Sequence, residues 1–300
     1  MLHELLAENR RRFHHTYSGG LTNHLPMCLG ALRELGADDD RLRRFFDLYA
    51  QRLEPAVPLV GIVDVRADRG RAITDVLARA PGEVASGAFH GIIRLAWAVD
   101  SDDDDDVAHA LHYLEATRGQ TTARPRGAGR ERSLIALAAR LRSAGIAAPP
   151  GRLISTRLQN LGSDPAFTAV VDDLAIDIDI NDMAIFGARV FAVCDDFSSL
   201  HIVTGADALI TLAPLSTRLA EAIHAAAVAA LGCFVLAGCP ALDEHDHADV
   251  DDDATIARLA CASDDDHVCK FAASCLRHAH RTGDRLFLAL ATRTVRRGVT

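Results

Sequence analysis

Residues 24–36 read HLPMCLGALRELG, and the spacing of their apolar side chains decides how the fold is predicted. These side chains recur every three or four residues, which places them on one face of a helix. They are Leu25, Cys28, Leu29, Leu32 and Leu35. Pro26 suits the first turn of a helix, where its missing amide hydrogen is not needed. Gly36 suits the position after the last turn. The stretch therefore predicts a helix with one buried face and with His24 at or just before its N-terminus.

The same helical spacing recurs along the chain, whereas the alternation typical of strands is mostly absent. We therefore predict an all-α fold, a single multi-helix domain with its functional site at the centre of the helical bundle. The further helices are expected at about 40–54, 71–80, 87–99, 105–117, 131–143, 182–194, 203–212, 216–237, 254–262, 266–281 and 284–297.

Two stretches interrupt the helical pattern. Residues 119–130, GQTTARPRGAGR, are rich in Gly, Pro, Thr and Arg, and residues 238–253 read GCPALDEHDHADVDDD. Histidine motifs described below lie on both sides of each stretch. We therefore interpret both as internal loops of one domain that spans residues 1–300.

Composition and charge narrow the function classes. With 49% hydrophobic and 24% charged residues, the chain resembles a soluble globular protein. A net charge of −9 and a lack of basic stripes exclude a nucleic-acid-binding surface of the usual kind. The N-terminal residues hold no signal-peptide core, and no later segment approaches the roughly 20 apolar residues of a spanning helix. We expect a cytoplasmic protein with no membrane partner, and the sequence leaves the oligomeric state open.

Three runs of aspartate, at 102–106, 249–253 and 264–266, each precede a helical pattern. Carboxylates at that position accept hydrogen bonds from the first amides of a helix and oppose its positive end. The glycine and final glutamate of a calcium-binding loop are missing. We interpret the runs as helix caps rather than calcium sites.

Four of the fourteen histidines share one setting, among small or apolar residues near an expected helix start. They are His24 in TNHLPM, His90 in GAFHGIIRLAWAV, His201 in SLHIVTGADAL and His267 in DDHVCKF. A buried imidazole costs free energy unless both ring nitrogens are satisfied, and a metal on one with an acceptor on the other is one solution. A hydrogen-bonded core histidine is the alternative for any one of them.

Lys270 is the only lysine among 32 basic residues. On a helix it shares a face with His267, three residues before it. An ammonium beside a metal ion would be repelled, so the amine must be neutral or modified. A carbamate formed with CO2 would make it an oxygen ligand, which arginine cannot become. The alternative is an ordinary surface lysine.

Four motifs in this order resemble the questin oxidase-like family: NHLPM with a helix ended by LGA, AFHGIIRLAWA, HIVTGADAL and DDHVCKF. The resemblance extends from about His15 to Val295 and includes the closing TGDRLFLALATRTV. It covers nearly the whole chain.

This resemblance implies a non-haem, metal-dependent oxygenase that acts on aromatic polyketides such as anthraquinones. It implies oxygenation or cleavage of a ring, of the Baeyer–Villiger-like or dioxygenase type, with O2 as co-substrate. The sequence leaves open whether NADPH is needed as a reductant. It implies Fe(II) held by four histidines and a carboxylated lysine, which match His24, His90, His201, His267 and Lys270 here. The oxygenase model has a deprotonated phenol donate an electron before oxygen adds to the ring.

Two residues at helical spacing from the predicted ligands are candidates for contacting the substrate. Arg94 lies four residues after His90 and can pair with a phenolate, or it is a surface arginine. Thr204 lies three residues after His201 and can bond a ligand or bound oxygen, or it caps the following helix.

Residues around the first motif are further candidates. Asn23 can orient the ring of His24. His15 and Tyr17 lie shortly before the motif and are candidate bases.

Two rival functions stay open. DDH at 265–267 and HDHADVDDD from 245 also suit a metal phosphohydrolase with histidine and aspartate ligands. The chain can also be an inactive helical scaffold or binding protein, with the four histidines as satisfied core groups. Iron in the purified protein distinguishes the oxygenase from the scaffold.

Overall fold

The computed structural model of the chain describes residues 1–119, 129–242 and 250–298. Within these ranges it contains fifteen α-helices and one sheet of two short strands. The all-α prediction is therefore confirmed. Parts of both predicted loops, 120–128 and 243–249, lie outside the described residues.

The helices begin and end as follows: α1 Leu2–Arg12, α2 Leu25–Glu34, α3 Asp39–Ala50, α4 Arg69–Arg79, α5 His90–Asp100, α6 Asp104–Ala116, α7 Leu134–Ser143, α8 Ile154–Leu161, α9 Pro165–Val171, α10 Ile180–Cys194, α11 Phe197–Leu212, α12 Leu219–Leu236, α13 Asp253–Ala262, α14 Asp266–Thr282 and α15 Arg285–Arg297. Two short 3₁₀ helices are η1 Pro81–Glu83 and η2 Ala213–Leu215. Strands β1 Thr16–Tyr17 and β2 Leu21–Thr22 form an antiparallel hairpin.

Aspartate caps begin many of these helices, as the sequence predicts. The side chains of Asp103, Asp252 and Asp265 accept hydrogen bonds from the amides of Asp106, Thr255 and His267 at 2.9, 2.7 and 2.8 Å. Each satisfies an amide that the first helical turn leaves without a partner. The capping interpretation of the acidic runs is confirmed for these residues.

Contacts between Cα atoms divide the described residues into two compact units. The first unit contains residues 1–72, 93–116 and 250–298, and the second contains 73–92, 117–119 and 129–242. Each unit is described by itself below. That the chain forms one domain stays a prediction.

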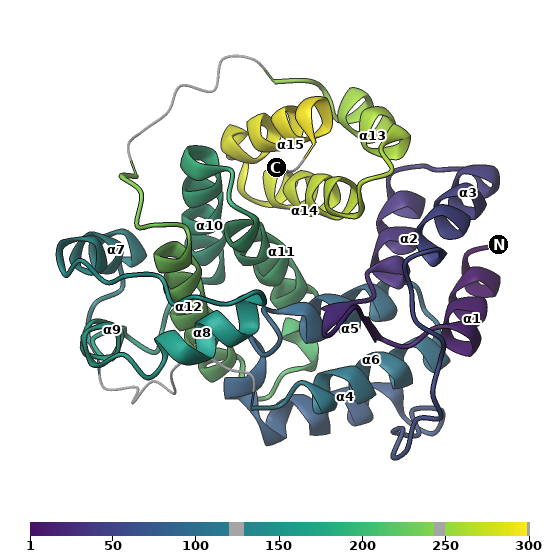
Figure 1. Cartoon of the computed structure of the whole chain (residues 1–300), viewed down its shortest axis with the longest axis horizontal. Helices are drawn as coiled ribbons and strands as arrows, with labels where there is room; N and C mark the ends of the chain where they lie inside the picture. The colour runs from purple at the N-terminus through teal and green to yellow at the C-terminus, as the bar shows by residue number, and fades with distance from the viewer. Residues whose placement is uncertain (120–128, 243–249, 299–300) are drawn as a thin grey trace. The chain divides into compact units, whose positions relative to one another are not determined.

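In the first unit, α14 packs against α2 and α15, and α13 packs against α14 and α15 (Figure 1). Helix α2 also contacts α1 and α3. The face of α2 that the spacing predicts is buried at Leu25, Cys28, Leu29 and Leu32. This packing brings the N-terminus of α2 and the first turns of α14 together.

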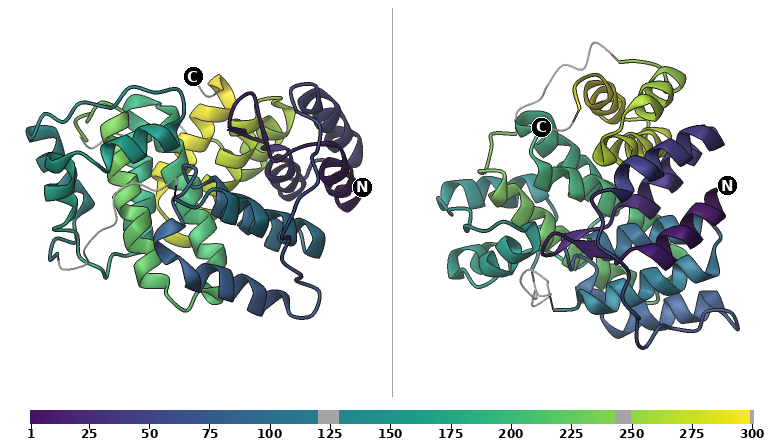
Figure 2. Two further views of the ribbon diagram at one scale, coloured as in Figure 1. Left: turned by 60° about the horizontal axis from the view of Figure 1, so that its bottom comes forward. Right: turned by 45° about the vertical axis from the view of Figure 1, so that its right-hand side comes forward.

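In the second unit, α10 and α11 form a closely packed pair that is visible in both views of Figure 2. A Cβ atom at Gly187 of α10 would lie 2.6 Å from Ile202 Cγ2 of α11, so only glycine permits this approach. Helix α12 contacts α7, α8, α10, α11 and η1. Its residues 222–236 are all buried, as expected for the central helix of a core.

Two segments of the second unit, Phe197–Leu215 and α12, are long and apolar enough to cross a membrane by length and composition alone. However, 72% and 83% of these segments are buried inside the protein. Helices that are apolar all round and buried are also typical of globular cores. A cytoplasmic location and the absence of a membrane partner stay predictions.

Candidate functional site

The predicted ligand residues fall into two groups. His24, His267 and Lys270 lie in the first unit, and His90 and His201 lie in the second. Within each unit the imidazoles are close together. The ring centroids of His24 and His267 are 4.9 Å apart, and those of His90 and His201 are 4.7 Å apart.

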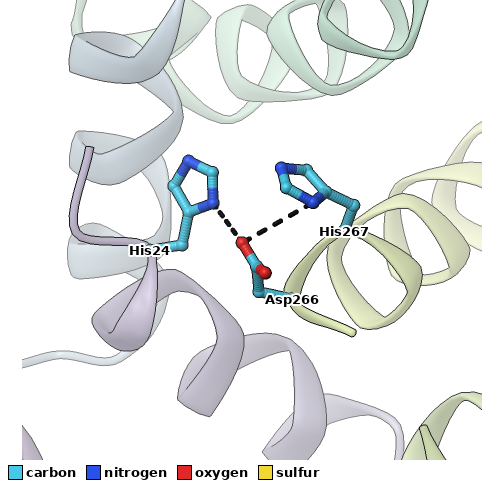
Figure 3. A group of neighbouring side chains, drawn as sticks. All are labelled: His24, Asp266 and His267. Carbon is cyan, nitrogen blue, oxygen red and sulfur yellow. Dashed lines mark hydrogen bonds and ion pairs between the residues drawn. The ribbon is translucent and has the colours of Figure 1, made fainter. Parts of the chain in front are cut away.

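In the first unit, Asp266 lies between the two imidazoles (Figure 3). Nδ1 of His24 is 2.5 Å from Asp266 Oδ2, and Nδ1 of His267 is 3.6 Å from the same oxygen. Figure 3 shows the other nitrogen of each ring turned away from the carboxylate. These three side chains form a group of potential metal ligands whose donor atoms lie within 4.8 Å of one another.

The short contact identifies Asp266 as a hydrogen-bond acceptor for His24 and not as a second ligand on the same ion. Metal–ligand bonds of about 2.0–2.2 Å place two ligand atoms about 3 Å apart. A separation of 2.5 Å between nitrogen and oxygen is too short for two ligands of one ion and is that of a short hydrogen bond. Since a carboxylate only accepts, Nδ1 of His24 carries the hydrogen, and the lone pair is on Nε2.

Burial and neighbouring charges set the protonation of His24 and Asp266. Burial lowers the pKa of His24 to about 3, and the nearby charge of Lys270 adds to the shift. Burial raises the pKa of Asp266, but the hydrogen bond from His24 and the charges of His267 and Lys270 outweigh it, so the pKa is well below its usual value. At neutral pH the imidazole is therefore neutral and the carboxylate ionised.

Lys270 is 4% exposed, so the alternative of an ordinary surface lysine is wrong. It lies in α14, one turn after His267, and its charge acts on both His24 and Asp266. The side chain of Asp265 caps α14 by accepting from the amide of His267. This cap starts the helix at the residue that places Asp266, His267 and Lys270 beside the N-terminus of α2.

In the second unit, Nε2 of His90 lies 3.2 Å from Nε2 of His201. Nδ1 of His90 donates to the carbonyl oxygen of Gly87 at 2.6 Å, and Nδ1 of His201 donates to that of Phe197 at 2.8 Å. Since carbonyl oxygens only accept, both Nδ1 atoms carry hydrogen. Two neutral rings would therefore direct two lone pairs toward each other.

Such an arrangement is repulsive unless an electron-poor centre is shared by the two nitrogens. A proton or a metal ion can be that centre. Metal–nitrogen bonds of about 2.0–2.1 Å give a nitrogen–nitrogen separation of about 3 Å between adjacent ligands. The observed 3.2 Å fits two imidazoles on one ion.

Two backbone features place these histidines: an unusual turn before α5, and a start of α11 earlier than the sequence predicts. Gly87, Ala88 and Phe89 have φ angles of 61, 58 and 67°, in the left-handed region that a bulky residue rarely adopts. They turn the chain so that α5 begins at His90. Helix α11 begins at Phe197 rather than at about 203, because Asp196 caps it by accepting from the amide of Ser198. His201 therefore lies within the second turn and not before the helix.

Three of the predicted ligand histidines, His24, His90 and His201, thus donate from Nδ1 to an oxygen acceptor. Nδ1 of His267 lies 3.5 and 3.6 Å from carboxylate oxygens of Asp265 and Asp266, longer than an ordinary hydrogen bond.

Other buried histidines do not share the pattern of these three. His224 has Nε2, not Nδ1, at 3.1 Å from the carbonyl oxygen of Leu174. Nδ1 of His278 lies 3.0 Å from Arg281 Nη1, which can only donate. The shared orientation separates the three predicted ligands from ordinary core histidines.

Thr204 does not cap a helix, so that alternative is wrong. Its side chain lies inside α11, and Oγ1 donates to the carbonyl oxygen of Leu200 at 3.3 Å. A bond from Thr204 to a ligand or bound oxygen stays a prediction. Tyr17 lies in β1, with its ring against the edge of Tyr49 at a centroid distance of 6.5 Å.

The prediction that Asn23 orients His24 is wrong. The amide oxygen of Asn23 accepts from the amide of Leu25, and its nitrogen donates to Asn9 Oδ1 and to the carbonyl oxygen of His14. Asp266 performs that role instead. The sequence signal for it was its place directly before His267, which we interpreted as part of a helix cap or as a phosphohydrolase ligand and not as the partner of His24.

Arg94 and His15 lie together in the first unit, where both line a cavity. Arg94 is 2% exposed, so the alternative of a surface arginine is wrong. Whether either residue acts on a substrate stays a prediction.

No protein-family model and no curated protein matches this chain. The resemblance to the questin oxidase-like family therefore stays a prediction that depends on the four motifs.

Proposed function

We propose that this protein is an iron-dependent oxygenase that oxygenates or cleaves the ring of a phenolic or quinone substrate. One observation supports it most. Three of the four histidines expected as ligands, His24, His90 and His201, donate from Nδ1 to oxygen acceptors, which leaves the lone pair of a neutral ring on Nε2. Metal-binding histidines in proteins are commonly held in this way.

The donor set suits ferrous iron. Imidazoles are borderline ligands that bind iron well, and one hard oxygen ligand beside them favours iron over metals that prefer thiolates. Lys270 would supply that oxygen after its neutral amine attacks CO2, forms an N–C bond and loses a proton. The resemblance predicts one ion for all five side chains, which stays a prediction.

Bound iron would supply the activation of O2. The residues of this chain would hold and orient its ligands and limit the access of water. Asp266 holds the ring of His24 in one tautomer, and backbone carbonyls do so for His90 and His201. His24, His201 and Lys270 are each at most 6% exposed, which limits contact of the donors with bulk water.

The test combines metal analysis with oxygen uptake. We expect purified protein to contain iron in a fixed ratio to the chain and to consume O2 when a hydroxyanthraquinone is added. His90→Ala should abolish this uptake, with His224→Gln as a matched control in another buried histidine. Protein with no stoichiometric iron and no uptake would favour the scaffold alternative.

A metal phosphohydrolase is a second candidate, because a carboxylate lies between two histidines in the first unit. The hydrogen-bond distance between His24 and Asp266 makes this carboxylate a poor candidate for a ligand. Part of the other acidic stretch, 245–249, lies outside the described residues. Phosphate release from a phosphomonoester, with no O2 uptake, would favour this function.

A further inference from the structure

A cavity of about 380 Å³ lies within the first unit, between α1, the segment 56–62 and α5. Its volume is in the range of sites that hold small organic molecules. Neither His24, His267 nor Lys270 lines it. The cavity is therefore a separate feature from the candidate metal ligands.

The titratable side chains that line this cavity are all of basic residue types. They are Arg10, Arg11, Arg94, His14, His15 and His109. Among the described residues that line it there is no aspartate or glutamate, although the chain as a whole has a net charge of −9. Low-dielectric walls with charge of one sign favour a ligand of the opposite sign.

Arg10 already has acidic partners. Its guanidinium lies 3.1 Å from Asp103, 3.9 Å from Asp105 and 3.6 Å from Asp106. Its charge is therefore largely balanced by the protein itself, and it is not the main candidate for binding an anion.

Arg94 differs from Arg10 in its partners. Its side chain is 2% exposed, and its closest carboxylate oxygen, on Asp106, is 3.9 Å from Nη2, beyond a hydrogen bond. Within the described part of the chain, neither Nε nor Nη1 has a hydrogen-bond acceptor. The ring of Tyr113 lies 6.0 Å from the guanidinium carbon and contributes only a weak cation–π contact. A buried guanidinium with two unused donors is costly for a protein that binds nothing there.

Two histidines of the cavity, His15 and His109, do not compete with Arg94 for an anion at neutral pH. Burial and the neighbouring basic groups lower the pKa of His15 to about 3 and that of His109 to about 4. Both rings are therefore neutral and can donate or accept hydrogen bonds. Arginine stays protonated at this pH.

Apolar side chains also line the cavity. Phe13, Val57, Leu59 and Ile62 line it, and Val57 and Ile62 are 54% and 41% exposed. Exposed apolar side chains beside a cavity provide surface that the body of a ligand can cover. The cavity thus combines one cationic contact with an apolar wall.

We propose that this cavity binds a small organic carboxylate, with its carboxylate on the guanidinium of Arg94 and its apolar body against Phe13 and the segment 56–62. This site goes beyond the proposed oxygenase, because no metal ligand lines it and Arg94 here binds a carboxylate in place of the phenolate predicted from the sequence. Binding should occur whether or not the protein contains metal.

The test is calorimetric titration of the full chain, metal-loaded and metal-free, with 2-naphthoate. The neutral isostere 2-naphthamide tests the charge, and inorganic phosphate tests whether an anion without an apolar body is enough. A hydrogen bond to a charged group contributes enough that 2-naphthamide should bind about 10- to 100-fold more weakly. Phosphate should bind at least as weakly as the amide.

Three variants locate the site. Arg94→Gln should weaken 2-naphthoate at least tenfold, and Arg94→Lys should also weaken it, because an ammonium lacks the planar donors. Arg33→Gln, an exposed arginine of α2 that does not line the cavity, is the control and should bind as the wild type does. If Arg94→Gln fails to fold, the double variant Arg94→Gln/Asp106→Asn removes both partially paired charges together.

Equal affinity for naphthoate and naphthamide would overturn the proposal, since the cavity would then be only apolar. Binding of phosphate as tight as that of 2-naphthoate, or tighter, would overturn the claim that the ligand has an apolar organic body. Unchanged affinity in folded Arg94 variants, or no binding of 2-naphthoate by the wild type, would overturn it altogether. These results do not depend on iron content, so they are distinguishable from a failure of the proposed oxygenase.

Discussion

Nε2 of His90 and Nε2 of His201 lie 3.2 Å apart while both Nδ1 atoms donate to backbone carbonyls. The backbone therefore selects the same tautomer in both rings. A pair of core histidines would more readily use one ring as donor and the other as acceptor. This relationship is the clearest physical reason to look for a metal in the second unit.

We expect His201→Gln to lose most of the metal that the wild type retains after purification. The variant keeps a polar side chain of similar length but removes the imidazole lone pair. His224→Gln, in the same unit, should retain the metal, because its ring bonds a carbonyl through Nε2. Elemental analysis of both proteins checks this, and equal metal content would contradict His201 as a ligand.

Lys270→Arg should lower the metal content while leaving helicity nearly intact, because arginine cannot form a carbamate. Circular dichroism and elemental analysis measure the two properties. Growth with ¹³C-bicarbonate should also give a carbamate carbon signal by NMR in the wild type only. Full metal occupancy in Lys270→Arg would show that the amine is not a precursor of a ligand.

Asp266→Ala should weaken metal binding by about 10- to 100-fold, the usual effect of removing the acceptor behind a ligand histidine. Asp284→Ala is a matched control, because Asp284 caps α15 by accepting from the amide of Leu286. The control should lose about 1 kcal/mol of stability without a change in metal affinity. Competition with a chelator of known affinity measures the first effect, and thermal unfolding the second. The role of Asp266 would be refuted by equal metal affinities.

Gly205→Ala should destabilise the protein by about 1–3 kcal/mol through overpacking. A Cβ atom there would lie 2.7 Å from Cδ1 of Phe89, the residue before His90. The double variant Gly205→Ala/Phe89→Leu should recover part of the lost stability, because leucine is smaller than phenylalanine. Chemical denaturation gives the free energy of unfolding of both variants. If the changes in the free energy of unfolding from the two substitutions simply add, the close contact between positions 205 and 89 does not contribute to stability.

Acid should destabilise the protein partly through His15. Its pKa is about 3 in the folded chain, against 6.5 when unperturbed, because of burial and the charges of His14, Arg94, His112 and His109. Below pH 6.5 the unfolded state takes up a proton that the folded state does not, so the free energy of unfolding falls between about pH 6.5 and 3. His15→Asn should therefore show a smaller fall in Tm between pH 7 and 4.5. An identical fall in both proteins would show that His15 titrates normally.

Apolar spacing predicted most of the helices because each buries one face or lies in the core. Helices α1, α8 and α9 were not predicted. Only Leu5, Leu6 and Asn9 of α1 are buried, which leaves too weak a pattern to see. Helix α9 has 7 residues, fewer than the periodicity needs, although Asp164 and Pro165 are a recognisable start.

The sequence predicted site residues whose type limits what they can do, such as histidine. It did not predict roles that depend on contacts between residues far apart in the chain. Histidines in apolar surroundings pointed to His24, His90, His201 and His267 as candidates, whereas their arrangement as the pairs His24–His267 and His90–His201 comes from the structure. The contact between His24 and Asp266 joins residues 242 positions apart, which no local pattern specifies. The burial of Arg94 was missed for a related reason, since arginine is usually exposed and only the packing of α5 decides otherwise.

The single buried lysine has a practical consequence. A sample grown with isotope-labelled lysine contains one labelled side chain, so one resonance would follow that amine through every change of solvent, gas or metal.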